Sequence, residues 1–211
     1  MDLETAHILA RYLLEIEAVK LRPEEPFTWA SGWKSPVYCD NRLALSYPRI
    51  RTYVKNALYE LIQTAFPQAE AIAGVATAGI PQGVLVADML ALPFVYVRAK
   101  AKEHGMGNLI EGKIEKFQKV VLVEDLISTG KSSLQAAEAL QAAEAEVMGM
   151  AAIFSYGFET AAKAFAVKNI PLVTLTTYEI LAEEAITAGY IAPEMLETLQ
   201  NWQKSPENWG I

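Results

Sequence analysis

Apolar residues recur along this chain with two alternating periods. In residues 3–20 they return at the three- and four-residue spacing of a helix that buries one face. In residues 119–124 (KVVLVE) they are nearly contiguous, as in a strand that is covered on both sides. The helical pattern predicts helices over residues 3–20, 48–66, 80–90, 131–145, 159–168, 178–188 and 193–204. The second pattern predicts strands over residues 27–29, 37–40, 69–76, 94–98, 119–124, 147–155 and 172–175.

The order of these elements indicates the fold class. From about residue 69 to residue 190 short apolar strands alternate with helices, which favours a parallel sheet covered by helices on both faces, the α/β class. No linker, repeat or low-complexity tract divides the chain. We therefore predict a single domain over residues 1–211, with an N-terminal helix and hood (1–45), an α/β core (46–190) and a C-terminal helix and tail (191–211).

Composition and charge narrow the function classes. A hydrophobic content of 52% with 20% charged residues indicates a globular chain rather than a disordered one. A net charge of −7 disfavours general nucleic-acid binding, although a local basic site for a small anion remains compatible with it. The single cysteine, Cys39, excludes an internal disulfide and a Cys-rich zinc site.

The same sequence lacks the signals of export and membrane insertion. The first residues are acidic where a signal peptide is basic. The least charged run, residues 71–97, contains prolines, glycines and Asp88, which a bilayer span would hardly tolerate. We expect a reduced, cytoplasmic protein whose partners include neither nucleic acid nor membrane.

The strongest chemical signal is VVLVEDLISTGKSS, residues 120–133. A buried strand delivers Glu124 and Asp125 to its carboxyl end, where ligands of open α/β sheets bind. A turn of small residues follows, with Gly130 at its centre, and a helix then begins. The hydroxyls of Ser128, Thr129, Ser132 and Ser133 add donors to this turn. Free N–H groups at a helix start attract anions. An ordinary Ser/Thr cap would fit the turn alone, but the two acids favour a phosphate cradle beneath paired carboxylates.

A nucleotide-binding P-loop is the main alternative for Gly-Lys-Ser at this turn. That motif needs a first glycine five residues before its second, and the position holds Asp125, whose carboxylate would repel the phosphates. Paired acids above a phosphate loop suit a phosphorylated sugar instead. The loop holds the 5′-phosphate, and the carboxylates accept hydrogen bonds from ribose hydroxyls and stabilise positive charge at the anomeric carbon.

At this segment the chain resembles the type I phosphoribosyltransferases, whose signature is a hydrophobic strand, two acids and a Thr/Ser-Gly turn. Residues 27–42 (FTWASGWKSPVYCDNR), 74–83 (GVATAGIPQG) and 97–112 (VRAKAKEHGMGNLIEG) narrow the resemblance to the members that act on orotate. The match covers most of residues 27–155. It implies the family fold, a parallel-sheet core with helices on both faces and a small N-terminal hood.

The resemblance also implies a reaction. The 5-phosphoribosyl group of 5-phosphoribosyl 1-diphosphate (PRPP) is transferred to orotate, giving orotidine 5′-monophosphate and pyrophosphate, a step of de novo UMP synthesis. It implies Mg²⁺ as cofactor and a homodimer with shared active sites, because the mobile loop of the family reaches into the neighbouring subunit. We assign no residue as a metal ligand, since magnesium should be carried largely by oxygens of PRPP.

Residue roles are carried over by matching positions. The resemblance implies Lys102, His104 and Asp125 as catalytic residues, and contact between Ser128 and orotate. The implied PRPP site comprises Arg98, Lys102, His104, Glu124, Asp125, Leu126, Ile127, Ser128, Thr129, Gly130, Lys131 and Ser132. An arginine fork, a mobile lysine charge and a histidine proton donor suit a departing pyrophosphate. The polar, glycine-containing loop of residues 99–118 interrupts two strands, and its residues 99–112 would close over the site as a lid that excludes water.

The chain departs from the family pattern where some members carry basic residues, at Ala30, Ala78, Ala99 and near Tyr156. Lys100 is a candidate to compensate for Ala99, and Lys34 and Arg42 are candidates to bind the orotate carboxylate. Two other functions stay open: a transferase for another base, and a regulator that senses PRPP without catalysis. The retained Arg98, Lys102 and His104 and the absence of a basic appendage favour the enzyme.

Overall fold

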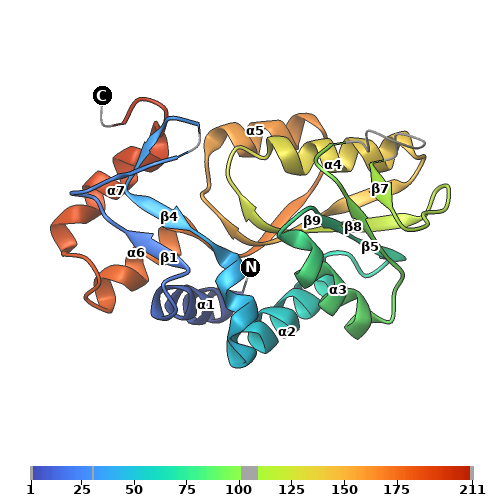
Figure 1. Ribbon diagram of the computed structural model, residues 1–211, viewed down its shortest axis with the longest axis horizontal. Coiled ribbons are helices and arrows are strands. Elements are labelled where there is room, and N and C mark those ends of the chain that lie inside the picture. The colour runs from blue at the N-terminus through green and yellow to red at the C-terminus, as the bar shows by residue number, and fades with distance from the viewer. Residues whose placement is uncertain (1, 30, 101–108, 210–211) are drawn as a thin grey trace.

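The computed structural model describes residues 2–29, 31–100 and 109–209. Its centre is a six-stranded sheet in the order β10-β9-β8-β5-β6-β7 (Figure 1). The strands are β5 (Ala71–Val75), β6 (Phe94–Val97), β7 (Ile110–Glu111), β8 (Lys119–Ile127), β9 (Glu146–Ser155) and β10 (Leu172–Thr177). The first five in this order pair in parallel, and β7 joins the edge antiparallel to β6. The predicted α/β class is confirmed.

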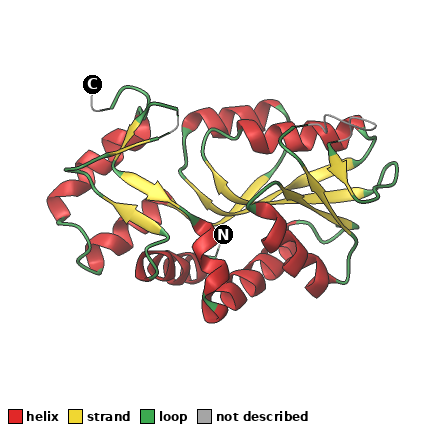
Figure 2. Ribbon diagram, in the orientation of Figure 1, coloured by secondary structure: helices red, strands yellow, loops and turns green. Residues whose placement is uncertain are grey.

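Helices cover both faces of this sheet (Figures 1 and 2). One face is packed by α4 (Lys131–Ala142) and α5 (Glu159–Val167), the other by α2 (Pro48–Ala65) and α3 (Gly79–Leu90). Successive strand residues point to opposite faces, so Ile72 and Val121 pack with α2 and α3, whereas Ala73 and Leu122 pack with α4 and α5. Burial on both sides explains the contiguous apolar runs of the strands.

Both ends of the chain build a second group of elements beside the sheet. The N-terminal part comprises α1 (Leu3–Glu15), β1 (Val19–Leu21), β2 (Phe27–Thr28), β3 (Lys34–Ser35), β4 (Val37–Cys39) and the 3₁₀-helix η1 (Asn41–Ser46). The C-terminal part comprises α6 (Tyr178–Thr187), η2 (Pro193–Met195) and α7 (Leu196–Lys204). The Trp202 indole Nε1 of α7 donates to the Lys34 carbonyl oxygen at 3.2 Å, which joins the two parts. None of the described helices combines the length and apolarity that crossing a bilayer requires.

Several predicted boundaries are wrong for a shared reason. The helix predicted over residues 3–20 ends at Glu15, because β1 pairs antiparallel with β4, with Val19 opposite Cys39. The helix predicted over residues 131–145 ends at Ala142. The strand predicted over residues 119–124 continues to Ile127, and the loop predicted over residues 99–118 contains β7. Pairing with a strand that is distant in the sequence decides where these elements begin and end. The division at residues 45 and 190 stays a prediction.

Candidate active site

The candidate site lies at the switch point of the sheet. The chain proceeds from β5 to β6 on one side, then crosses β5 to form β8, β9 and β10 on the other. Pairing of β8 with β5 ends at Val123, whereas pairing of β8 with β9 continues to Ile127. The last residues of β8, beginning with Glu124 and Asp125, therefore project beyond the end of β5. Ligands of open α/β sheets bind at such a point.

A close contact between α3 and β8 shapes one wall of the site. A Cβ added at Gly79, the first residue of α3, would lie 2.3 Å from the Val123 carbonyl oxygen, so only glycine lets the helix start here. Gly74 and Gly83 pack in the same way against the Phe94 ring. The glycine pattern of residues 74–83 thus serves helix–sheet packing, and the short loop before Gly79 lines a cavity at this edge of the sheet.

The predicted phosphate turn and the paired acids line one cavity of about 480 Å³. Helix α4 begins directly after Gly130, whose φ of +76° is left-handed and which offers no side-chain cap. Free N–H groups of the first turn are therefore available to an anion. The cavity is lined by Ala76, Thr77, Ala78, Glu124, Asp125, Leu126, Ser128, Thr129, Gly130, Lys131, Ser132, Ser133 and Gln135.

The two acids differ in burial: Glu124 is buried, and Asp125 beside it is half-buried. Glu124 is 6% exposed, and its carboxylate accepts hydrogen bonds from Ser133 Oγ (3.1 Å) and the Asp125 N–H (3.1 Å). Burial raises the pKa of Glu124, and the adjacent Asp125 charge raises it further. Burial also raises the pKa of Asp125, against the opposing effects of its contact with Glu124 and the Arg42 charge. The pair therefore retains a proton at pH values where exposed carboxyls are ionised.

The hydroxyl side chains of residues 128–133, predicted together as phosphate donors, have two different surroundings in the structure. Ser133 was predicted as a phosphate donor, but it is 2% exposed and donates to Glu124, so it supports the acid instead. Ser128, Thr129 and Ser132 line the cavity, and their contacts with substrates stay predictions. Ile127 is fully buried in the core, and its side chain does not reach the cavity.

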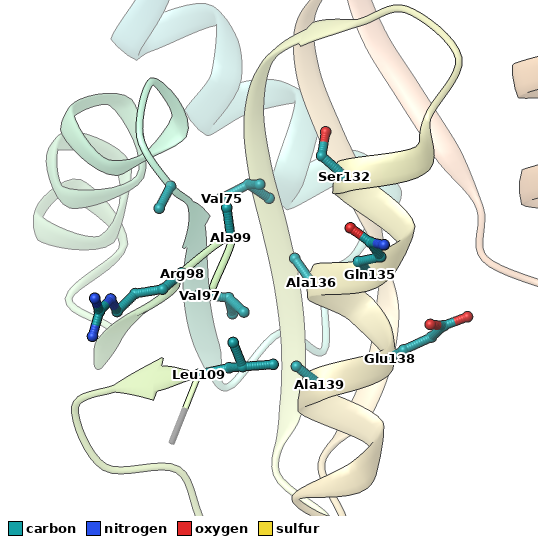
Figure 3. Close-up of a pocket in the computed structure, with 11 residues that line it drawn as sticks. Val75, Val97, Arg98, Ala99, Leu109, Ser132, Gln135, Ala136, Glu138 and Ala139 are labelled. Carbon is teal, nitrogen blue, oxygen red and sulfur yellow. The ribbon is translucent and has the colours of Figure 1, made fainter. Parts of the chain in front are cut away.

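Arg98 lies in a neighbouring cavity of about 420 Å³, between the ends of β5 and β6 and the first turns of α4. The two cavities share Ala76, Ser132 and Gln135. In Figure 3 the Arg98 side chain extends away from α4. Its Nη1 lies 3.5 Å from a carboxylate oxygen of Glu111 on β7. The other two cations of the predicted pyrophosphate site, Lys102 and His104, lie outside the described residues, and their roles stay predictions.

The hood contributes a contact that the sequence analysis missed. The Asn41 side-chain Nδ2 donates to the Asp125 carbonyl oxygen at 2.8 Å, and Asn41 is 1% exposed. Asp40 precedes it, and its carboxylate accepts from the Arg42 N–H and binds the Arg42 guanidinium with two hydrogen bonds. The available signal was the Asp-Asn pair directly after a strand, which is typical of a helix start. Its partner on β8 could not be predicted locally.

Tyr156, at the end of β9, is buried in an aromatic cluster. Its ring centroid lies 5.1 Å from Trp29, 5.3 Å from Phe158 and 5.5 Å from Trp202, and burial raises its pKa well above the ordinary value. Trp29 and Trp33 belong to this packing rather than standing free. Of the two candidate cations for a substrate carboxylate, Arg42 is bound to Asp40, whereas the Lys34 ammonium contacts the neutral Thr28 hydroxyl at 2.8 Å.

A parallel sheet with paired acids and an amide-lined turn at its switch point defines the class of the phosphoribosyltransferases, and the phosphoribosyl transferase domain model matches residues 45–185. Within that class the chain belongs to the orotate phosphoribosyltransferase family. It is 57% identical over 201 residues to the orotate phosphoribosyltransferase of Cytophaga hutchinsonii, covering 95% of this chain and 96% of the relative.

Two further comparisons agree with this family. The orotate phosphoribosyltransferase of Porphyromonas gingivalis is 54% identical over 204 residues, covering 97% of both chains. The crystal structure of orotate phosphoribosyltransferase from Aeropyrum pernix superimposes with a TM-score of 0.76 at 30% identity, covering 87% of this chain and 99% of that one. The predicted family and the predicted type I core are confirmed.

Proposed function

We propose that this chain transfers the 5-phosphoribosyl group of PRPP to orotate, forming orotidine 5′-monophosphate and pyrophosphate within de novo UMP synthesis. The observation that carries the proposal is the cavity in which buried Glu124 and half-buried Asp125 face the open N-terminus of α4. The substrate comes from the relatives, which are named orotate phosphoribosyltransferases and match 95–97% of this chain.

The cavity supports the following mechanism. Main-chain N–H groups at the start of α4 bind the 5′-phosphate, and the carboxylates of Glu124 and Asp125 accept hydrogen bonds from the ribose hydroxyls. Breaking the anomeric C–O bond places positive charge on the ribose, which the adjacent Asp125 carboxylate stabilises. Orotate attacks beside Ser128, and pyrophosphate leaves toward residues 76–78 and Arg98. By family resemblance, Lys102 and His104 assist that departure.

Mg²⁺ is part of this proposal. The cavity offers carboxylate oxygens of Glu124 and Asp125, which are hard donors of the kind magnesium prefers. The acid pair therefore fits an ion held mainly by oxygens of PRPP. Such an ion would neutralise charge on the departing pyrophosphate.

We assign the orotate carboxylate to Lys34 rather than Arg42, since Arg42 already neutralises Asp40. Lys34→Ala should raise the KM for orotate about tenfold and leave that for PRPP nearly unchanged, as expected for the loss of one charged hydrogen bond. Arg42→Ala is the comparison variant. A larger increase of the orotate KM in Arg42→Ala would reverse the assignment, and unchanged values in both would remove both residues.

The proposal extends to a cytoplasmic homodimer with shared active sites, binding neither nucleic acid nor membrane. Exposed apolar side chains on β4, on η1 and directly after η1 support a protein partner at the hood: Tyr38, Leu43 and Tyr47 are each more than one third exposed. A second copy of this chain is the partner that the family resemblance implies.

A panel of bases tests the proposed reaction. The protein is incubated with PRPP, Mg²⁺ and either orotate, uracil, adenine or guanine, and consumption of orotate is followed by its ultraviolet absorbance. We expect release of pyrophosphate with orotate alone. Release with another base would identify a different transferase, and binding of PRPP without turnover on any base would identify a regulator.

A further inference from the structure

Asn41 connects the hood to the acid pair across 84 positions of sequence. It is the first residue of η1, it is 1% exposed, and its amide Nδ2 donates to the Asp125 carbonyl oxygen at 2.8 Å. A buried amide of this kind is held only where its polar atoms find partners. The contact therefore fixes the distance between η1 and the end of β8.

Neighbouring residues determine which end of the amide faces β8. The Cys39 thiol lies 3.3 Å from Asn41 Oδ1 and donates to it, so the Nδ2 donor is turned toward Asp125. Asp40 accepts hydrogen bonds from the backbone and guanidinium of Arg42 and thereby caps η1. Asn41 is thus held from both sides, as a positioning side chain must be.

The strand that receives this contact, β8, is paired on only one side at that point. Beyond Val123, β8 loses its pairing with β5 and keeps its pairing with β9. Asp125 lies in this one-sided stretch, and its main chain sets where its carboxylate points. Loss of the Asn41 donor would remove the contact that holds this strand end against η1 and free it to shift. A shift of about 1 Å is enough to impair a site that works by orientation.

We propose that Asn41 is a positioning residue for the known class of reaction: it holds Asp125 in register for the ribose of PRPP and ties that register to the hood. The proposal rests on the function proposed above in placing PRPP over Asp125. Asn41 itself does not line the cavity in which the proposed function places PRPP. The effect of its removal should therefore fall on the sugar donor rather than on the base.

Three variants test the proposal. Asn41→Ala removes the donor, and Asn41→Asp keeps the size and polarity of the side chain while replacing the donor with an oxygen. Ser35→Ala is the matched control, because Ser35 is also fully buried in the hood and donates to the Val37 carbonyl oxygen at 2.8 Å, without contacting β8. Calorimetry with PRPP and Mg²⁺ gives the affinity for PRPP, and steady-state kinetics separate kcat from both KM values.

We expect both Asn41 variants to weaken PRPP binding about tenfold, the change that loss of one buried hydrogen bond produces, and to leave the orotate KM within about twofold. Ser35→Ala should leave PRPP affinity nearly unchanged. Unchanged PRPP affinity in Asn41→Asp would overturn the proposal, and so would an equal loss of PRPP affinity in Ser35→Ala. If Asn41→Ala does not fold, Asn41→Asp alone decides the test. Because affinity is measured without a base, a wild-type chain that binds PRPP but ignores orotate would contradict the proposed function alone.

Discussion

Glu124 and Asp125 were predictable at the residue scale because their evidence is local. Two acids at the end of the most apolar strand and a Ser/Thr-Gly turn after them occupy fourteen consecutive positions, residues 120–133. Ser133 and Asn41 were not assigned correctly, because the partners that define them are set by the folded chain. Ser133 reaches back nine positions to Glu124, and Asn41 reaches forward to the carbonyl of Asp125.

Burial of Glu124 leads to a pH dependence of stability. Its pKa in the folded chain lies above the ordinary value of 4.5, so the folded state binds more protons than the unfolded state above that pH. The contribution of Glu124 to stability is therefore complete below its ordinary pKa and is lost as the pH rises through the raised pKa.

Glu124→Gln should remove this contribution. Thermal unfolding of the unliganded protein, measured from pH 4 to pH 9, should show a Tm that falls less steeply with pH in the variant than in the wild type. Glu183→Gln, at an exposed position of α6, is the control and should keep the wild-type slope. Parallel curves for the wild type and Glu124→Gln would show that Glu124 has the same pKa in both states.

At the scale of elements, local patterns predicted the seven described α-helices and the five parallel strands of the sheet, and distant pairing decided where several of them end. The parallel strands carry long apolar runs, so each was found, whereas the two-residue strands β3 and β7 were missed. Strand β1 was absorbed into the preceding helix, because its three residues carry no period of their own and are held by β4. The strand–turn–helix unit of β8 and α4 is the exception, since Gly130 marks its turn in the sequence and in the structure.

Gly130 should be more sensitive to substitution than a glycine with the same backbone conformation elsewhere. Both Gly130 (φ +76°) and Gly189 (φ +75°) are left-handed, but a Cβ at Gly130 would lie 2.8 Å from the Phe165 ring, and a Cβ at Gly189 meets nothing within 4 Å. Backbone strain of about 1–2 kcal/mol is common to both alanine variants. Crowding adds about 1–3 kcal/mol to Gly130→Ala alone.

Urea unfolding of the two variants measures that difference. Gly130→Ala should lose at least about 1 kcal/mol more of its unfolding free energy than Gly189→Ala, and it should also bind PRPP less tightly. Equal losses of unfolding free energy would show that Phe165 yields to the added methyl group, and that the turn is not closely packed.

At the scale of the whole molecule, the N-terminal part (α1 to η1) and the C-terminal part (α6 to α7) pack together beside the sheet, so the hood contains both. Trp202 of α7 donates to the Lys34 carbonyl oxygen, and Gln203 Nε2 donates to the Tyr156 carbonyl oxygen at 2.8 Å. From the sequence we predicted only the N-terminal part of this hood. The C-terminal part carries no motif, and its place in the hood depends on the contacts of Trp202 and Gln203 with residues 168 and 47 positions away along the chain.

The proposed shared site predicts complementation between inactive chains. Lys102→Ala should lower kcat by a factor of about 10 to several hundred, and Asp125→Asn should impair PRPP binding. After unfolding and refolding an equal mixture of the two variants, mixed dimers contain one site with both residues intact. About a quarter of wild-type activity should return by random pairing. A mixture no more active than the mean of its components would show that each chain completes its own site.

The central claim is that PRPP lies over Asp125 with its 5′-phosphate against the start of α4. A crystal structure of the wild-type protein with PRPP and Mg²⁺ tests it most directly. We expect the 5′-phosphate within hydrogen-bond distance of main-chain N–H groups of residues 129–132, and ribose hydroxyls against Glu124 and Asp125. PRPP bound at full occupancy in another cavity, with no contact to Asp125 or Gly130, would contradict the account.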